Sequence, residues 1–486
     1  MQIASISAAG LLAGCGDRSG AGWAGEGNRG RLDWSAALRV PPLDEGRVEN
    51  GVRVFDLTAA AGASEFRRGV RTPTCGFNGA YLGPTLRAAR GERVRVDVHN
   101  ELDETTTVHW HGMRLPAVMD GTPHQPVEPA AVWSPTWTIE QPAATLWYHP
   151  HPHGATAAHV YRGLSGMWIV DDPETDDMLP NEYGIDDVPL VIQDRDLGGD
   201  GTLREDRSNP FWGLLGNDIL VNGSFGPHFV VTTRLVRFRI LNGSNARVYN
   251  LRFDDARQFH VVATDCGLLA SPVVVDEVTV SPGERVEVLV EFEARQTRVL
   301  TSRPRGHGID DGEFDIVQLR AADTLLDNGS VPGELAGPAA IELPSAATHR
   351  EFILAGDARI NSKEMDMARI DVVVPVGSVE EWEVWAPGVP HNFHIHDAAF
   401  TILEVDGRPP PAHAQGLKDT VFLPSDARAR LAVRFGEYPD PHTPYMFHCH
   451  ILRHEDKGMM GQFTIVEPGS EDTAPRRIEV GASHDH

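Results

Sequence analysis

The residues with the clearest chemistry lie close to the C-terminus. The tripeptide His448-Cys449-His450 is followed there by His454 and Met459. Side chains of an extended chain alternate between two faces, so Cys449 points away from both flanking histidines. One thiolate, two imidazoles and a weakly bound thioether form the ligand set of a blue-copper electron-transfer centre. The sequence therefore predicts such a centre around Cys449, and its second histidine must come from elsewhere.

A second histidine-rich stretch lies at residues 389–396. If this stretch is also extended, His394 and His396 share one face and His391 lies on the opposite face. His391 can then join Cys449, His454 and Met459 as the missing imidazole. The remaining four histidines of the two stretches are left for a second centre that contains only imidazoles.

Two further His-x-His pairs occur in the first third of the chain, at His109 and His111 and at His149 and His151. Imidazole is a preferred nitrogen ligand for copper, and eight histidines from four segments are enough to hold several copper ions. Zinc is the rival metal. Structural zinc sites are built from four Cys or His ligands in paired short motifs, and Cys449 has no second cysteine near it.

These four segments resemble the four copper motifs of the multicopper oxidases, in their usual order, and the similarity runs from about residue 81 to residue 466. The resemblance implies four copper ions: one type 1, one type 2 and two type 3. Type 1 copper would be held by His391, Cys449, His454 and Met459. The resemblance also implies that dioxygen is reduced to two waters at the type 2 and type 3 ions. Their implied ligands are His109 and His394 for type 2, and His111, His149, His151, His396, His448 and His450 for type 3.

Reduction of dioxygen consumes protons, which buried carboxyl groups commonly supply. Asp120 follows His111 by nine residues, and Glu455 lies beside His454. Both match acids that the family uses, so we expect them to be catalytic. The alternative for each is an ordinary surface charge.

Short alternating strands broken by Gly and Pro predict an all-β chain, and 48 Gly and 35 Pro agree with turn-rich structure. The resemblance implies three cupredoxin-like Greek-key β-sandwich domains, the second without copper and acting as a spacer. We expect these segments: a signal and lipobox remnant with a flexible tether (1–45), domain 1 (46–174), domain 2 (175–327), a linker (328–348), domain 3 (349–470) and a tail (471–486).

An apolar stretch at the N-terminus ends in Leu12-Ala13-Gly14-Cys15, which resembles a bacterial lipoprotein cleavage site. No Lys or Arg precedes this stretch. We therefore expect an exported protein, periplasmic or attached to the cell envelope, with a possible lipid anchor at Cys15. The alternative is a weakly apolar tail. A net charge of −26 argues against a nucleic-acid partner. Cys75 and Cys266 could form a disulfide, but we expect each to be a small buried residue instead.

The reducing substrate is less clearly specified. Within the family the chain resembles the bacterial copper-efflux oxidases and their laccase-like relatives, with residues 242–247 and 454–460 among the shared stretches. Those copper-efflux oxidases carry a Met-rich insertion before the third-domain motif, whereas here that region holds only Met365 and Met367. We therefore expect a laccase-like oxidase of phenols and aromatic amines, with oxidation of Cu(I) or other metal ions as the alternative. Some family members have lost their copper ligands and act in cell division, but here every ligand is present. A copper-storage protein would need no oxygen-reducing centre.

Overall fold

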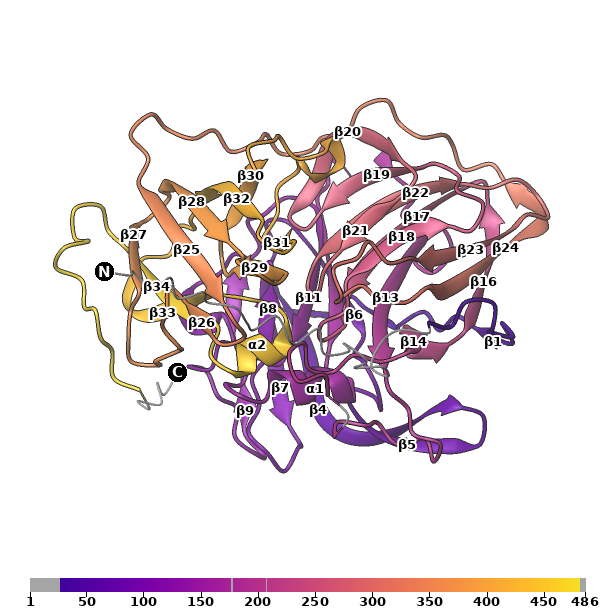
Figure 1. Cartoon of the computed structure of the whole chain (residues 1–486), viewed down its shortest axis with the longest axis horizontal. Helices are drawn as coiled ribbons and strands as arrows, with labels where there is room; N and C mark the ends of the chain where they lie inside the picture. Colours follow the sequence, from indigo (N-terminus) through magenta and orange to yellow (C-terminus); the bar gives the residue numbers. More distant parts are fainter. Residues whose placement is uncertain (1–26, 176–177, 207, 481–486) are drawn as a thin grey trace, which may run out of the picture.

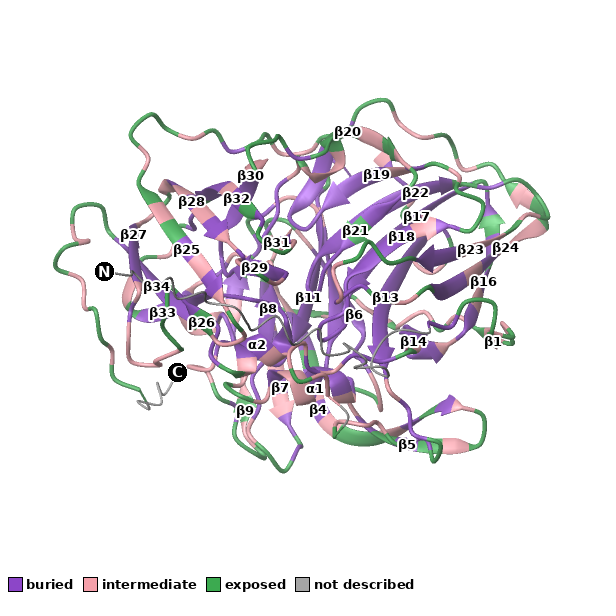
Figure 2. Ribbon diagram, in the orientation of Figure 1, coloured by how far each residue is buried: buried purple, intermediate pink, exposed green. Residues whose placement is uncertain are grey.

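The computed structural model describes residues 27–175, 178–206 and 208–480. Its strands form six sheets that pack in pairs. Each pair encloses a separate hydrophobic core, so the chain forms three β-sandwiches (Figure 1). The strand interiors are buried and the connecting loops carry most of the exposed residues (Figure 2). The all-β fold with three sandwiches, expected from the sequence, is confirmed.

The first sandwich packs a sheet of β3, β4, β5, β7, β9 and β10 against a sheet of β2, β6, β8, β11 and β12. Its strands are β2 (Leu43–Asp44), β3 (Arg47–Glu49), β4 (Val52–Arg67), β5 (Val70–Phe77), β6 (Thr85–Ala89), β7 (Arg93–Asn100), β8 (His109–His111), β9 (Val132–Trp133), β10 (Thr136–Thr138), β11 (Ala144–His149) and β12 (Gly166–Asp171).

The second sandwich contains a six-stranded and a seven-stranded sheet. Its strands are β1 (Ala36–Ala37), β13 (Asp187–Arg195), β14 (Asp218–Val221), β15 (Ser224–Phe225), β16 (Pro227–Thr233), β17 (Leu235–Asn242), β18 (Tyr249–Phe253), β19 (Phe259–Thr264), β20 (Gly267–Val275), β21 (Val278–Val280), β22 (Arg285–Glu291), β23 (Thr297–Ser302) and β24 (Phe314–Leu326).

The third sandwich contains two five-stranded sheets. Its strands are β25 (His349–Ala355), β26 (Arg359–Ile360), β27 (Val372–Pro375), β28 (Val379–Trp385), β29 (His391–Ile395), β30 (Ala399–Val405), β31 (Thr420–Leu423), β32 (Arg428–Arg434), β33 (Asp440–His448) and β34 (Met460–Val466). Two short helices, α1 (Thr156–Arg162) and α2 (Leu452–Asp456), lie side by side near the middle of the molecule (Figure 1).

Alternating side chains explain why these segments form half-buried strands. In β7 the residues Val94, Val96 and Val98 are completely buried, while the residues between them are partly exposed. Apolar side chains at every second position all face one side of a strand, and this side packs on the core.

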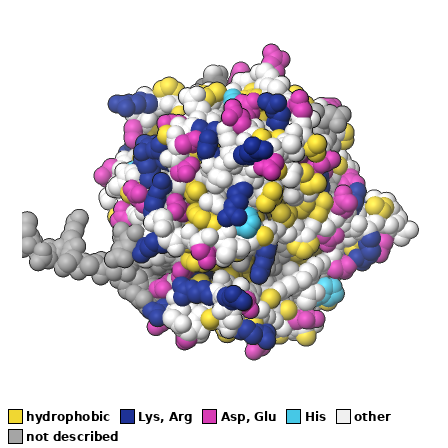
Figure 3. All heavy atoms as spheres, turned by 90° about the vertical axis from the view of Figure 1, so that its right-hand side faces the viewer, with side chains coloured by type: hydrophobic (Ala, Val, Ile, Leu, Met, Phe, Trp, Pro, Cys, Tyr) yellow, Lys and Arg dark blue, Asp and Glu magenta, His cyan; other side chains and the backbone are white. Residues whose placement is uncertain are grey.

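On the surface, basic and acidic side chains are interspersed over the face shown in Figure 3.

Residues 27–45 differ from the flexible tether that their composition predicts. Asn28 is buried and exchanges hydrogen bonds with the backbone of Asp315 (3.1 and 2.6 Å). Ala36–Ala37 adds to the second sandwich beside β16, and Leu43–Asp44 adds to the first beside β6. Strand pairing of so few residues carries no periodic signal, which is why composition alone misassigns it. Cys15 lies outside the described residues.

The segment between the second and third sandwiches has no strand or helix, as its Gly, Pro and Ala content predicts. It is nevertheless attached along its length, because the N–H of Leu335 donates to the carbonyl of Ala270 (2.9 Å) and the side chain of Ile341 is buried. Among the described residues, no helix is long and apolar enough to span a membrane.

Candidate metal centres

Strand register brings the histidines of each half of the molecule together. In the first sandwich, antiparallel pairing of β8 with β11 places His109 opposite His149. In the third, pairing of β29 with β33 places His394 opposite His448. The same faces carry the neighbouring histidines of each motif, as the sequence predicts.

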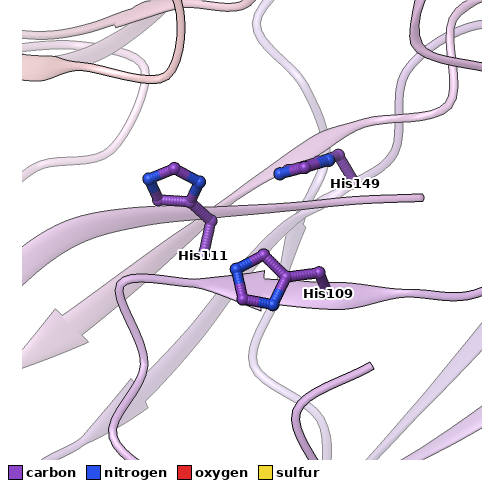
Figure 4. Close-up of side chains that lie close together, drawn as sticks. All are labelled: His109, His111 and His149. Atoms are coloured by element: carbon purple, nitrogen blue, oxygen red, sulfur yellow. The ribbon is translucent and has the colours of Figure 1, made fainter. Parts of the chain in front are cut away.

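The two halves meet at the junction of the first and third sandwiches and form one cluster of eight imidazoles, here called the imidazole centre. The ring of His109 stacks on that of His396 (3.8 Å between centroids), and His111 stacks on His394 (3.7 Å). Figure 4 shows His109, His111 and His149 around a common space. All eight are buried: His109, His111, His149, His151, His394, His396, His448 and His450.

The hydrogen bonds of these rings leave nitrogen lone pairs directed into the cluster. The Nδ1 atom of His109 donates to the carbonyl of Asp120, and that of His394 donates to the carbonyl of Asp419, both over 2.9 Å. His149 donates in the same way to Pro150 (2.9 Å). Their Nε2 atoms are buried and have no hydrogen-bond partner among the described residues. Neutral imidazole nitrogens of this kind are suited to bind metal ions.

Three further lone pairs crowd together. The Nε2 atom of His448 lies 3.2 Å from the Nε2 atoms of both His151 and His396. The Nδ1 atom of His448 donates to the carbonyl of Cys449 (3.1 Å), and those of His396 and His151 face the carboxyl groups of Asp120 and Glu455, so the Nε2 atoms carry the lone pairs. Lone pairs at this separation repel one another unless a cation lies between them. The donor set therefore fits metal ions.

Burial also keeps the rings of the imidazole centre neutral. Loss of hydration disfavours the charged form of a buried histidine and lowers its pKa. The pKa is lowered below its usual value for His111, His149, His151, His394, His396, His448 and His450, and burial is the largest cause in each. At neutral pH these nitrogens are available as ligands without first losing a proton.

A second group, here called the thiolate centre, consists of His391, Cys449 and His454. The Nδ1 atoms of both histidines lie 3.5 Å from the Cys449 sulfur and 3.2 Å from each other. Met459 is completely buried, and its carbonyl accepts a hydrogen bond from the N–H of Cys449 (3.1 Å), which places it beside the centre. His454 comes from α2, a helix that the sequence does not predict.

The two candidate catalytic acids both lie against the imidazole centre. Asp120 places one oxygen 2.7 Å from Nδ1 of His396 and the other 3.3 Å from Nδ1 of His109. Glu455 lies 3.5 Å from Nδ1 of His151 and 3.4 Å from Nδ1 of His448. Both are buried, so neither is an ordinary surface charge. Burial, as the largest cause, raises the pKa of Glu455 well above its usual value.

Asp419 is a site residue that motif reasoning missed. One of its oxygens accepts a hydrogen bond from Nε2 of His111 (3.1 Å), and both oxygens accept from the Arg285 guanidinium (2.8 and 2.6 Å). Burial alone would raise the pKa of Asp419, but Arg285 and His111 hold it well below its usual value. Asp419 follows no His-x-His pair, so only the β29–β31 pairing reveals it.

The second sandwich contributes no histidine to either centre within the described residues, but it is more than a spacer. Arg285 comes from the start of β22 and is completely buried between the other two sandwiches. The carbonyl of Phe211, in the loop between β13 and β14, accepts a hydrogen bond from Nε2 of His454 (3.2 Å). The second sandwich therefore contacts both centres.

Two details differ from the simple strand interpretation of the motifs. Strand β11 ends at His149 and β33 ends at His448, so His151, Cys449 and His450 lie just beyond regular strands. After β33 the chain stays extended because the N–H of His450 donates to the side-chain oxygen of Asn392 (2.8 Å).

Cys75 and Cys266 are both free thiols, Cys75 half-buried and Cys266 buried.

Three family models for multicopper oxidases match the chain, at residues 58–175, 203–302 and 336–469. They fall on the first, second and third sandwiches respectively. Together they cover both histidine-rich regions and the strands that position them.

Proteins that match this chain over nearly their whole length include multicopper oxidases and a cell division protein. Multicopper oxidase mco of Staphylococcus aureus is 33% identical over 433 residues, covering 87% of this chain and 91% of that protein. Cell division protein FtsP of Salmonella typhimurium is 36% identical over 447 residues, covering 89% and 93%. A solved structure, the laccase-like multi-copper oxidase CueO of Ochrobactrum sp., is 37% identical with a TM-score of 0.82, covering 88% of this chain and all of that chain. The chain belongs to the multicopper oxidase family, the copper oxidoreductases that use dioxygen as electron acceptor.

Proposed function

We propose that the chain is a laccase-like oxidase that couples one-electron oxidation of phenols and aromatic amines to reduction of dioxygen to water. The observation that carries the proposal is the pairing of a thiolate centre with a buried imidazole centre through consecutive residues of β33 and its extension. The thiolate centre would hold one type 1 copper through His391, Cys449, His454 and Met459. The imidazole centre would hold one type 2 copper (His109, His394) and two type 3 coppers (His111, His149, His151, His396, His448, His450).

Copper bound in this way supplies one-electron redox chemistry at the thiolate centre and four-electron reduction of dioxygen at the imidazole centre. The protein supplies the connection between them. His448 and His450 are the neighbours of Cys449 in sequence, and their rings lie among the other imidazoles, 4.9 Å from His151 and 5.0 Å from His111 respectively. An electron accepted at Cys449 therefore needs to cross only one residue of backbone in either direction.

Proton supply is assigned to Asp120 and Glu455. Burial, as the largest cause, raises the pKa of Glu455 well above its usual value and so favours the protonated form of this carboxyl group next to His151 and His448. Asp120 bridges His109 and His396 on another side of the imidazole centre. Protons can therefore reach the imidazole centre from two directions, while the thiolate centre needs none.

Asp120→Asn is expected to slow the reduction of dioxygen by ~10²-fold or more, because the amide keeps the shape of the side chain but cannot transfer a proton. Reduction of the thiolate centre should stay nearly unchanged. Stopped-flow absorption separates the two steps, as loss of the blue band under anaerobic donor and its return on mixing with oxygen. Glu455→Gln should act in the same direction. Slower bleaching with normal recovery would place the acid on the donor side instead.

Two observations bear on the electron donor. Aromatic rings of Phe211 and Trp212 lie against His454, which favours aromatic donors. The Ochrobactrum protein is described as active towards lignin model compounds and lignosulfonate, which are aromatic. The alternative donor, Cu(I), is favoured by Met365, because its N–H donates to the carbonyl of Gly458 (2.9 Å) beside Met459, so a second thioether residue lies close to the thiolate centre.

Oxygen uptake by copper-loaded protein tests the proposed function and its alternative together. With a methoxyphenol as donor we expect sustained uptake, with four donor molecules oxidised for each dioxygen. With Cu(I), held as a soluble complex, we expect slower uptake after subtraction of the protein-free rate. Faster uptake with Cu(I) would make the protein a cuprous oxidase. No uptake with either donor would count against an oxidase and favour another role, such as the cell division named for FtsP.

We also propose that the chain is exported, on the resemblance of Leu12-Ala13-Gly14-Cys15 to a lipoprotein cleavage site.

A further inference from the structure

The thiolate centre is covered by a loop of the second sandwich. Residues 209–213 lie between β13 and β14, and the Phe211 carbonyl oxygen lies 3.2 Å from Nε2 of His454. His454 directs Nδ1 towards Cys449, so Nε2 carries the hydrogen and donates to Phe211. The whole His454 side chain is completely buried. A donor molecule therefore cannot form a hydrogen bond with this imidazole unless the loop moves away.

Two aromatic side chains of the loop pack on His454. The ring centroid of Phe211 lies 5.1 Å from that of His454 and is nearly perpendicular to it (81°). The indole of Trp212 lies 5.9 Å from His454 at an angle of 38°, and 4.5 Å from the Phe211 ring. Trp212 is half-buried: one part packs on the core of the third sandwich and another part is accessible from outside. Trp212 thus contacts the buried imidazole and the solvent at once.

The loop is held firmly in this position. The side-chain oxygen of Asn209 accepts hydrogen bonds from the N–H groups of Phe211 (2.9 Å) and Trp212 (2.8 Å), and the backbones of Asn209 and Gly213 bond to each other. Gly213 has a φ of +84°, and a Cβ atom there would lie 2.7 Å from Cβ of Arg453. Only glycine allows the loop to approach α2 so closely.

We propose that Trp212 is the residue that aromatic donors contact, and that the electrons of these stacked donors enter the thiolate centre through the Phe211–Trp212 unit. The proposal rests on the proposed function and specifies its substrate contact. A planar phenol would stack on the accessible indole face. It would lose one electron to the centre and release its hydroxyl proton to solvent, leaving a phenoxyl radical. Donors that cannot stack gain nothing from Trp212, so the residue determines specificity for aromatic donors.

The test compares anaerobic reduction of the blue centre by two reductants. One is a methoxyphenol, and the other is hexaammineruthenium(II), which has no aromatic ring. Aromatic pairs contribute about 0.5–1.5 kcal/mol, so Trp212→Ala should slow reduction by the phenol about two- to tenfold. Reduction by the ruthenium complex should change less than about twofold, and Trp212→Phe should restore most of the phenol rate. Trp385→Ala, which removes another half-buried tryptophan, packed by Arg428, is the matched control and should change neither rate.

Two measurements besides rates separate donor contact from a structural role. The electron paramagnetic resonance spectrum and the midpoint potential of the blue centre should be the same in Trp212→Ala and in the original protein. A changed spectrum or potential, with both reductants slowed equally, would mean that Trp212 only packs the centre, and would overturn the proposal. An unchanged phenol rate would also overturn it, because donors then enter elsewhere. If the original protein forms no blue centre, the proposed function itself fails.

Discussion

Copper-loaded protein carrying Cys449→Ser is expected to be colourless and to take up no measurable oxygen with any donor. The strong blue colour of such centres comes from charge transfer between a thiolate sulfur and copper, which a hydroxyl cannot supply. Cys449 is completely buried, and two imidazole nitrogens lie 3.5 Å from its sulfur. Burial, as the largest cause, raises the pKa of this thiol to about 12, so copper has to displace its proton on binding.

Visible absorption, electron paramagnetic resonance and an oxygen electrode check this expectation. Cys75→Ser is the matched control, because Cys75 is a free, half-buried thiol on β5 that touches neither centre. The control should keep both colour and activity. A blue Cys449→Ser protein would show that the thiolate centre has been assigned to the wrong cysteine.

His450→Ala should have the opposite pattern, a blue centre that donors reduce but that oxygen fails to reoxidise. The His450 ring lies 5.0 Å from His111 and 5.3 Å from His149. Both of its nitrogens are buried without a hydrogen-bond partner among the described residues. Removing one ligand from the imidazole centre should therefore remove copper there, while His391, Cys449 and His454 stay in place.

Stopped-flow absorption with measurement of copper content tests this second expectation. The recovery of the blue band on mixing with oxygen should fall by ~10²-fold or more, as for loss of other groups that act directly in a reaction. His153→Ala is the control, since His153 continues the His-Pro-His-Pro-His run but is exposed. Normal recovery in His450→Ala, at full copper content, would separate His450 from oxygen reduction.

The imidazole centre could be predicted from the sequence because its ligands obey a local rule. The parity of His394 and His396 against His391 depends only on the extended chain, and the structure places His394 and His396 in the imidazole centre and His391 in the thiolate centre, as parity requires. Asp419 obeys no such rule. It reaches His111 because β31 pairs with β29, and a single acidic residue cannot show from sequence which strand its own will pair with.

The cover of the thiolate centre was equally hidden from sequence. Phe211 acts through its backbone carbonyl, which every residue possesses, so its type carries no signal. The role of Gly213 was hidden for a different reason, because only its approach to Arg453 in another sandwich shows why a glycine is needed there. Patterns identify side chains that repeat along one element, whereas contacts between distant elements depend on how the sandwiches dock.

The division of the imidazole centre between the first and third sandwiches affects how the protein is made. The ribosome completes β8 and β11 early, whereas β33 is among the last strands to leave the exit tunnel. Until then His109, His111, His149 and His151 form only half of the centre, and Cys449 has not been synthesised. A copper ion captured by the early half would lie in an incomplete, solvent-open shell. With copper as the proposed metal, insertion into the complete centre therefore has to wait for the finished polypeptide, because a ribosome that stops shortly before β33 yields a chain that lacks His448, Cys449 and His450.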